Sequence, residues 1–234
     1  MTFKQELIDK VAEISAGNWG VTAGRVVPEL RAISLGNVGK TLSACVLYAD
    51  LSGSTDIVDR MKPESAAECY KAFLHCASKL ITMNDGVIEA YDGDRVMGVF
   101  LGARKETRAV IAALQLHRAM TEIVNPQFHR RYMDHQDLRY TVGIDASDLL
   151  VCKAGVRGDS DLIWVGAAAN YAAKLNSFDG LDHDYPTRVT GRVFASIEPW
   201  AKVWVSGGDA WEGPYGKVSP HHHYRCKGSL DVPV

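Results

Sequence analysis

Residues 45–55 of the chain read CVLYADLSGST, and residues 87–101 read VIEAYDGDRVMGVFL. In the first stretch an apolar run predicts a buried strand, which gives way after Asp50 to a turn of small, hydroxyl-bearing residues. In the second stretch an Asp-Gly turn joins two strand-like segments, 87–91 and 95–101, and therefore predicts a hairpin. If the strand that ends at Asp50 is a neighbour of this hairpin, Asp50 and Asp94 lie side by side at the strand ends.

Two adjacent carboxylates repel each other unless a cation neutralises them. Hard divalent cations favour oxygen ligands of this kind, and a pair of such ions suits an in-line displacement at phosphorus. The pattern therefore predicts a metal site at Asp50 and Asp94. The alternative is that each aspartate only caps a turn, because aspartate is common in turns.

The rest of the pattern predicts one α+β domain. After the strand at Asp50, Pro63 stands at the start of an apolar helical stripe, and the hairpin follows. A second helix is predicted over 105–124, and alternating residues predict a strand over 138–144. This order gives a ferredoxin-like palm, βαββαβ, to which the C-terminal part adds a helix around Asn170 and further strands.

Residues 1–38 stand apart from the domain at 39–234. Apolar residues at helical spacing between Phe3 and Ile14 predict a short amphipathic helix. An irregular lead-in follows it. We expect this segment to pack on the main domain or on a partner subunit.

The bulk properties narrow the functional class. The 234 residues are 47% apolar and 23% charged, with a formal net charge of −2, which offers no general attraction for nucleic acid or for an anionic membrane. The five cysteines are scattered and predict reduced thiols rather than a disulfide framework. No signal peptide and no run of about 20 apolar residues is present, so the sequence predicts a cytoplasmic protein without direct membrane contact.

Several segments carry a family resemblance. Together with ADLSGST, the segments GDRVMGVF at 93–100, GAAANYAAKL at 166–175 and the stretch 218–230 resemble the class III nucleotidyl cyclases over about residues 40–232. Details at 143–147, 156–158 and 161–166 resemble one subgroup, the bacterial pyrimidine cyclases of the Pycsar anti-phage systems. The resemblance implies two divalent cations, Mn²⁺ or Mg²⁺, at Asp50 and Asp94, with the backbone carbonyl of Leu51 as a further metal ligand.

The turn after Asp50 is predicted to cradle a triphosphate. Small residues let backbone N–H groups approach an anion, and a helix N-terminus favours phosphate. The alternative is an ordinary helix cap by one of the hydroxyl residues. The residues of this turn are Leu51, Ser52, Gly53, Ser54 and Thr55.

Asn170 and Lys174 are four residues apart, so they project from one face of a helix. The resemblance implies that Asn170 orients the ribose and that Lys174 stands where the family has an arginine that steadies charge on the α-phosphate. Lysine keeps the charge but loses the bidentate fork. The alternative is a solvated helical pair. Lys227 matches a family lysine that reaches the triphosphate, and Arg225 could take its place.

Two positions of the sequence indicate which nucleotide base the protein could recognise. At the places where adenylate-type cyclases carry polar purine-reading residues, the chain has Ala90 and Ile163, and neither side chain hydrogen-bonds an adenine edge. Because polar readers contribute several orders of magnitude to discrimination, adenylate-type purine selectivity is not expected. Tyr48 lies on the same strand face as Asp50 and is a candidate to fill or read a smaller pocket, or else is an aromatic core residue.

The resemblance implies a pyrimidine nucleotide cyclase that converts UTP to 3′,5′-cyclic UMP and pyrophosphate. It also implies a homodimer with shared active sites and a product that acts on a separate effector protein in anti-phage defence. UTP is preferred to CTP because cyclic UMP is the commoner product in the subgroup. The alternatives are a CTP cyclase giving cyclic CMP, an adenylate or guanylate cyclase, and a catalytically inactive nucleotide-binding regulator, for which Lys174 is the strongest argument.

Overall fold

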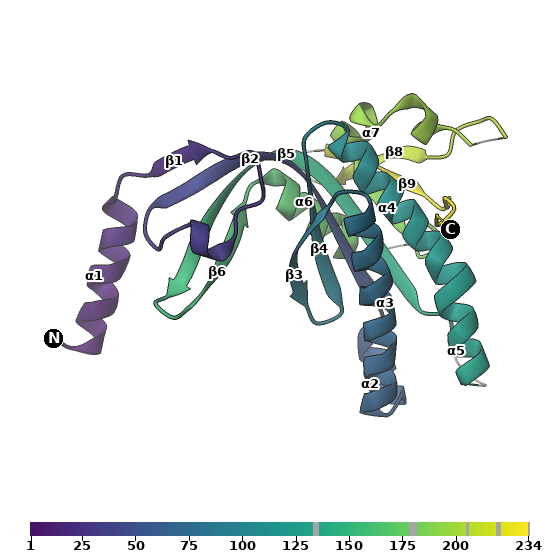
Figure 1. Ribbon diagram of the computed structural model, residues 1–234, viewed down its shortest axis with the longest axis horizontal. Coiled ribbons are helices and arrows are strands. Elements are labelled where there is room, and N and C mark those ends of the chain that lie inside the picture. Colours follow the sequence, from purple (N-terminus) through teal and green to yellow (C-terminus); the bar gives the residue numbers. More distant parts are fainter. Residues whose placement is uncertain (133–135, 178–181, 205, 219–220, 234) are drawn as a thin grey trace.

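The computed structural model describes residues 1–132, 136–177, 182–204, 206–218 and 221–233. Its centre is a twisted sheet with the strand order β3-β4-β2-β5-β7-β9-β8, to which β1 adds on β2 and β6 adds on β5 (Figure 1). The strands are β1 (Gly20–Ala23), β2 (Val38–Ser52), β3 (Val87–Asp92), β4 (Arg95–Leu101), β5 (Arg139–Val156), β6 (Asp159–Val165), β7 (Thr187–Thr190), β8 (Glu212–Val218) and β9 (His221–Cys226).

Helices cover both faces of this sheet. The larger core lies between the sheet and the pair α3 and α4, and a smaller core lies between β2 and α6 on the opposite face. The helices are α1 (Phe3–Ala16), α2 (Ser54–Arg60), α3 (Pro63–Met83), α4 (Lys105–Ala119), α5 (Asn125–Arg131), α6 (Ala167–Ser177) and α7 (Gly191–Ser196).

The predicted palm is confirmed, because β2, α3, β3, β4, α4 and β5 follow one another in the expected βαββαβ order. Pro63 is the first residue of α3, as expected from its fixed φ angle. Along α3 the side chains of Phe73, Ala77 and Leu80 are buried at helical spacing. Full burial of one large apolar side chain stabilises a fold by about 1.5–3 kcal/mol, so this stripe holds α3 on the sheet.

The helix predicted over 105–124 is longer than expected and is interrupted. α4 ends at Ala119, a single π turn covers Met120–Val124, and α5 continues to Arg131. Pro126 is the second residue of α5 and has no N–H to donate to the preceding turn, which accords with the interruption of the α-helical pattern there. Such π turns insert an extra residue into a helix and change the direction of its side chains.

α6 lies unusually close to β5. A Cβ built on Gly143 of β5 would lie 2.1 Å from the carbonyl oxygen of Ala172 and 3.0 Å from the amide nitrogen of Asn176. Only glycine permits this approach, so any substitution at Gly143 would push the helix away. The glycine therefore fixes where α6 presents Asn170 and Lys174.

α1 forms as predicted but projects from the body (Figure 1). None of its residues is buried, and its described link to the domain is the Asn37 side chain, which donates to the carbonyls of Ile14 and Gly17 at 2.8 and 2.9 Å. α1 thus does not pack on its own domain, and packing on a partner subunit, the other part of the expectation, stays a prediction. Within the lead-in, β1 is not irregular, because it pairs in parallel with β2.

No helix in the described ranges is both long and apolar enough to cross a membrane.

Candidate active site

The structure brings Asp50 and Asp94 to the same end of neighbouring strands. In the antiparallel pair of β2 and β4, Asp50 lies opposite Arg95. Asp94 directly precedes Arg95, in a turn that Gly93 closes with a φ of 61°. This register produces the juxtaposition of carboxylates expected from the hairpin signal.

The two carboxylates influence each other. Burial raises the pKa of the Asp50 carboxyl above its usual value, and the negative charges of Asp94 and Asp92 act in the same direction. Arg95 opposes them, because its Nε donates to Asp50 Oδ2 at 3.2 Å. The sequence reasoning missed Arg95 as the partner of Asp50, because the register between β2 and β4 depends on contacts between segments far apart in the chain.

One carboxylate oxygen of Asp94 lacks a hydrogen-bond donor among the residues that the structure describes. Its Oδ2 is buried and accepts no hydrogen bond from any residue that the structure describes. A buried carboxylate oxygen without a partner costs free energy, and a bound ion commonly compensates such an atom in folded proteins. The two carboxylates therefore fit a hard divalent cation.

The protein supplies few further side-chain ligands here. Within the described ranges, no group of three or more His, Cys, Asp or Glu side chains is placed to hold a metal ion. A cation at Asp50 and Asp94 would take its remaining ligands from backbone carbonyls, water or a bound phosphate. This donor set suits Mg²⁺ or Mn²⁺, which are commonly held by one or two carboxylates together with substrate phosphates.

The turn after β2 borders a large cavity. Gly53 is the N-cap residue of α2 and has a left-handed conformation with φ 72°. No side-chain hydrogen bond caps this helix, so neither Ser54 nor Thr55 is its cap. A cavity of about 920 Å³ opens beside Ser52 and Gly53. Arg139 lies opposite Ser52 across β2 and β5 and also lines this cavity. The turn is therefore accessible to a phosphate chain and has a guanidinium beside it.

Tyr48 and Ala90 lie in one row across the sheet. Tyr48 of β2 is opposite Met97 of β4, and Ala90 of β3 is opposite the same methionine. Tyr48 is half-buried; burial raises the pKa of its phenol, and its hydroxyl donates to Met97 Sδ at 3.2 Å. The two predicted base-pocket residues therefore lie in the same row with Met97 between them, and Tyr48 is two residues from Asp50.

Ile163 does not join this row. It lies on β6 opposite Cys152 of β5, and Cys152 is opposite Gly39 at the far end of β2. Nine residues of extended strand separate Gly39 from Tyr48, which is roughly 30 Å. Ile163 and Ala90 therefore lie on different rows of the sheet, although the neighbouring side chains Trp164 and Glu89 approach each other.

Asn170 and Lys174 are both exposed on α6, where their spacing of four residues places them on one face of the helix. The ammonium nitrogen of Lys174 lies 5.6 Å from the ring centroid of Tyr171. The buried side of the helix is formed by small residues and Leu175, which pack on the sheet. The polar face of α6 is thus presented to the outside of the domain.

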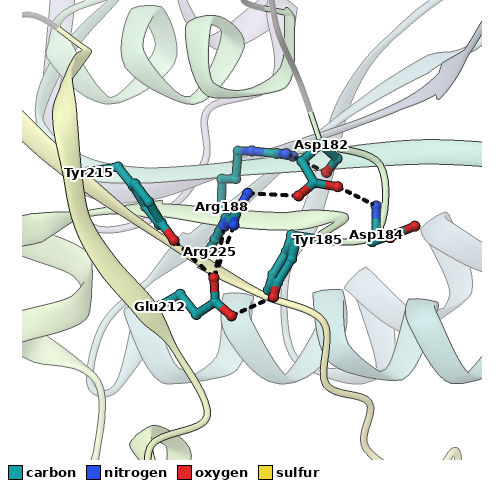
Figure 2. A network of polar contacts seen from close by, with 7 residues as sticks. All are labelled: Asp182, Asp184, Tyr185, Arg188, Glu212, Tyr215 and Arg225. Carbon is teal, nitrogen blue, oxygen red and sulfur yellow. Dashed lines mark hydrogen bonds and ion pairs between the residues drawn. The ribbon is translucent and has the colours of Figure 1, made fainter.

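Lys227 and Arg225, at the end of β9, differ in their surroundings. Lys227 is exposed, with its ammonium nitrogen 5.3 Å from the ring centroid of Tyr185. Arg225 donates to Glu212 at 3.0 Å and to Asp182 at 2.8 Å, and its guanidinium lies 3.9 Å from the ring centroid of Tyr185, within the polar network of Figure 2. The guanidinium of Arg225 is therefore held in contacts within the fold. Lys227 is exposed and is the better placed of the two to contact a ligand.

The carboxylates and the cations form two separate sets. Among the residues that the structure describes, no hydrogen bond, ion pair or ring contact links Asp50 or Asp94 to Asn170, Lys174 or Lys227. We call Asp50, Asp94 and Arg95 the carboxylate half-site. We call Lys174, Lys227 and Asn170 the cationic half-site.

Nucleotidyl cyclases are among the solved structures with this fold. The chain superposes on an adenylyl cyclase from P. aeruginosa with a TM-score of 0.69 at 18% identity, over 83% of this chain and 99% of that one. It superposes on a guanylyl cyclase with a TM-score of 0.66 at 21% identity, over 82% and 95%. The fold is therefore that of a nucleotidyl cyclase catalytic domain, and the predicted resemblance is confirmed.

Relatives found by sequence comparison identify a particular family among the nucleotidyl cyclases. The chain is 44% identical over 214 residues to a uridylate cyclase of Xanthomonas perforans, covering 91% of this chain and 90% of the relative. It is 42% identical over 213 residues to a uridylate cyclase of Burkholderia cepacia, covering 90% and 91%. No protein-family model matches. The chain belongs to the family of these uridylate cyclases.

Proposed function

We propose that the chain converts UTP to 3′,5′-cyclic UMP and pyrophosphate. The geometric observation that supports it best is the meeting of Asp50 with Asp94, whose buried oxygen has no hydrogen-bond donor among the described residues. Family membership at 44% identity supports the nucleotide. The apolar Ala90, in the same row of the sheet as Tyr48, leaves its position without the hydrogen-bonding group that a purine reader needs.

The reaction is an intramolecular substitution. The ribose 3′-oxygen attacks the α-phosphorus and gives up its proton, and pyrophosphate leaves with the electron pair of the broken phosphorus–oxygen bond. Asp50, Asp94 and the carbonyl of Leu51 would hold two divalent cations, which supply charge neutralisation and lower the pKa of the 3′-hydroxyl. The protein otherwise contributes mainly orientation and fixed charge.

The remaining residues take the following roles. Asn170 orients the ribose, and Lys174 stabilises the charge that develops on the α-phosphate. Lys227 and the backbone of Ser52 to Thr55 hold the rest of the triphosphate. Tyr48 and Ala90 border the base, with Ile163 supplied from the other chain.

The active unit is a homodimer in which each site combines the carboxylate half-site of one chain with the cationic half-site of its partner. The lack of a polar contact between the two half-sites among the described residues of one chain is consistent with this arrangement. A closed twofold dimer contains two such sites. A monomeric variant would therefore be inactive while remaining folded.

The test is product identification. The purified protein is incubated with ATP, GTP, CTP or UTP and Mn²⁺, and the products are identified by mass. Cyclic UMP is expected, and Asp94→Asn is the matched inactive control. Cyclic CMP or a purine product would contradict the choice of base, and binding of UTP without turnover would indicate a regulator rather than an enzyme.

In the cell, we propose that cyclic UMP serves as a cytoplasmic signal in defence against phage and acts on a separate effector protein. The resemblance to the pyrimidine cyclases of anti-phage systems motivates this role. Cyclic UMP is expected to rise after infection of cells that carry the wild-type chain together with its effector. Equal phage resistance with the Asp94→Asn chain would contradict it.

A further inference from the structure

A buried ion pair lies on the face of the sheet that α6 covers. Asp145 of β5 is fully buried, and it accepts hydrogen bonds from Arg192 Nε at 2.7 Å and Arg192 Nη2 at 2.8 Å. The hydroxyl of Thr190 also donates to it. A buried carboxylate without such partners would be strongly destabilising, so the pair has a structural reason to exist.

The ion pair does not use the whole guanidinium. Arginine carries five N–H donors in a rigid plane, and Asp145 engages only Nε and Nη2. About a third of the Arg192 side chain is exposed, at 31%. The remaining donors, two on Nη1 and one on Nη2, are held in a fixed position by the bidentate contact.

Arg192 lies beside the cationic half-site. Its Cζ is 5.7 Å from the ring centroid of Tyr171, the same ring that the Lys174 ammonium approaches at 5.6 Å. Tyr171 directly follows Asn170, and the ring of His221 meets it edge-on at 5.6 Å. Two cations from α6 and α7 therefore border one aromatic ring next to Asn170.

We propose that Arg192 is a further substrate-contacting residue, which binds the triphosphate chain beside Lys174 while Asp145 holds it in position. The inference rests on the proposed function, because it assigns Arg192 to that site. A guanidinium recognises phosphate oxygens in a defined geometry, whereas the ammonium of Lys174 acts as a point charge. The two cations complement each other.

The competing possibility is that Arg192 only neutralises Asp145. The double variant Asp145→Asn/Arg192→Gln separates the two, because it removes both charges and keeps a side-chain hydrogen bond possible between the two positions. Removal of both partners of a buried pair is far less destabilising than removal of one. Lys202→Gln is the matched control, since Lys202 is also a cation near an aromatic ring, at 5.0 Å from Phe194.

The experiment measures unfolding temperature, turnover of UTP and inhibition by inorganic triphosphate. The double variant is expected to fold, to lose about a hundredfold in kcat, and to be inhibited about tenfold more weakly. Lys202→Gln is expected to match the wild type. A folded double variant with wild-type kcat and inhibition would overturn the proposal.

If the double variant does not fold, the single variant Arg192→Lys tests whether Arg192 contacts the substrate. It keeps a positive charge for Asp145 but loses the fork, so about a tenfold loss of kcat and weaker triphosphate inhibition are expected. Unchanged values would overturn the role of Arg192. Failure of the wild type to make any cyclic nucleotide would contradict the proposed function instead, and triphosphate binding would still test Arg192 separately.

Discussion

The two half-sites are built in different ways. In the carboxylate half-site, Asp50 and Asp94 are placed by backbone register, and the charges meet at strand ends where burial raises the pKa of Asp50. In the cationic half-site, Lys174 and Lys227 are exposed and lie near tyrosine rings. A rigid backbone suits groups that must converge on an ion, whereas a ring contact, worth about 0.5–1 kcal/mol when exposed, orients a long cation and leaves its donors available.

The largest expected effect tests the carboxylate half-site. Asp50→Asn or Asp94→Asn should each lower kcat by about a thousandfold, because a bound cation contributes several kcal/mol to the transition state. Steady-state turnover of UTP with Mn²⁺ measures this. Asp92→Asn is the matched control, since Asp92 is exposed on the same hairpin and should retain turnover within about twofold. An active Asp94→Asn enzyme would contradict the proposed metal site.

The next prediction tests whether the half-sites come from different chains. Asp50→Ala and Asn170→Ala should each be inactive, and each leaves one half-site intact. After random reassortment of a mixture, half of the dimers are mixed and each has one complete site, so about a quarter of wild-type activity should return. Turnover is measured before and after mixing. A mixture that stays inactive after proven subunit exchange would argue against shared sites.

A smaller expected effect distinguishes the binding role of Lys227 from the structural role of Arg225. Lys227→Ala should reduce kcat/KM by about tenfold and leave the unfolding temperature unchanged, because the side chain is exposed. Arg225→Ala should lower the unfolding temperature by about 2–4 °C, since it removes the partner of Glu212 and Asp182 and each kcal/mol corresponds to about that shift in a domain of this size. The reverse assignment of effects would overturn the distinction.

The smallest effect concerns stability and pH. Because burial raises the pKa of Asp50 in the folded state, its charged form disfavours folding, and the cost appears as the pH rises through the folded pKa. In the absence of metal, Asp50→Asn should therefore unfold at an equal or higher temperature than the wild type at neutral pH. The difference should shrink on acidification and vanish below the ordinary pKa of the carboxyl, where Asp50 is protonated in both the folded and the unfolded state. Thermal unfolding across pH measures it, and a variant that is less stable at neutral pH would show that the Arg95 ion pair dominates.

Local sequence signals were sufficient for much of the fold. The Asp-Gly turn between 87–91 and 95–101 predicted the hairpin of β3 and β4, and Pro63 marked the start of α3. These signals are local, because turn conformations and φ preferences act within a few residues. What covers α1 was left open between its own domain and a partner subunit, since periodicity shows that a helix has an apolar face but not what covers it.

The sequence by itself determined the order of the elements, the placing of Asp50 and Asp94 at strand ends, and the shared helical face of Asn170 and Lys174. Only the tertiary structure decided that Arg95 pairs with Asp50, that Arg225 is bound within the fold while Lys227 is exposed, and that Arg192 reaches Asp145 across 47 positions of the chain. The physical reason is that local patterns record which residues favour a strand or a helix. Sheet register and helix packing depend instead on contacts between segments far apart in the chain, and those contacts settle the partner of each charge.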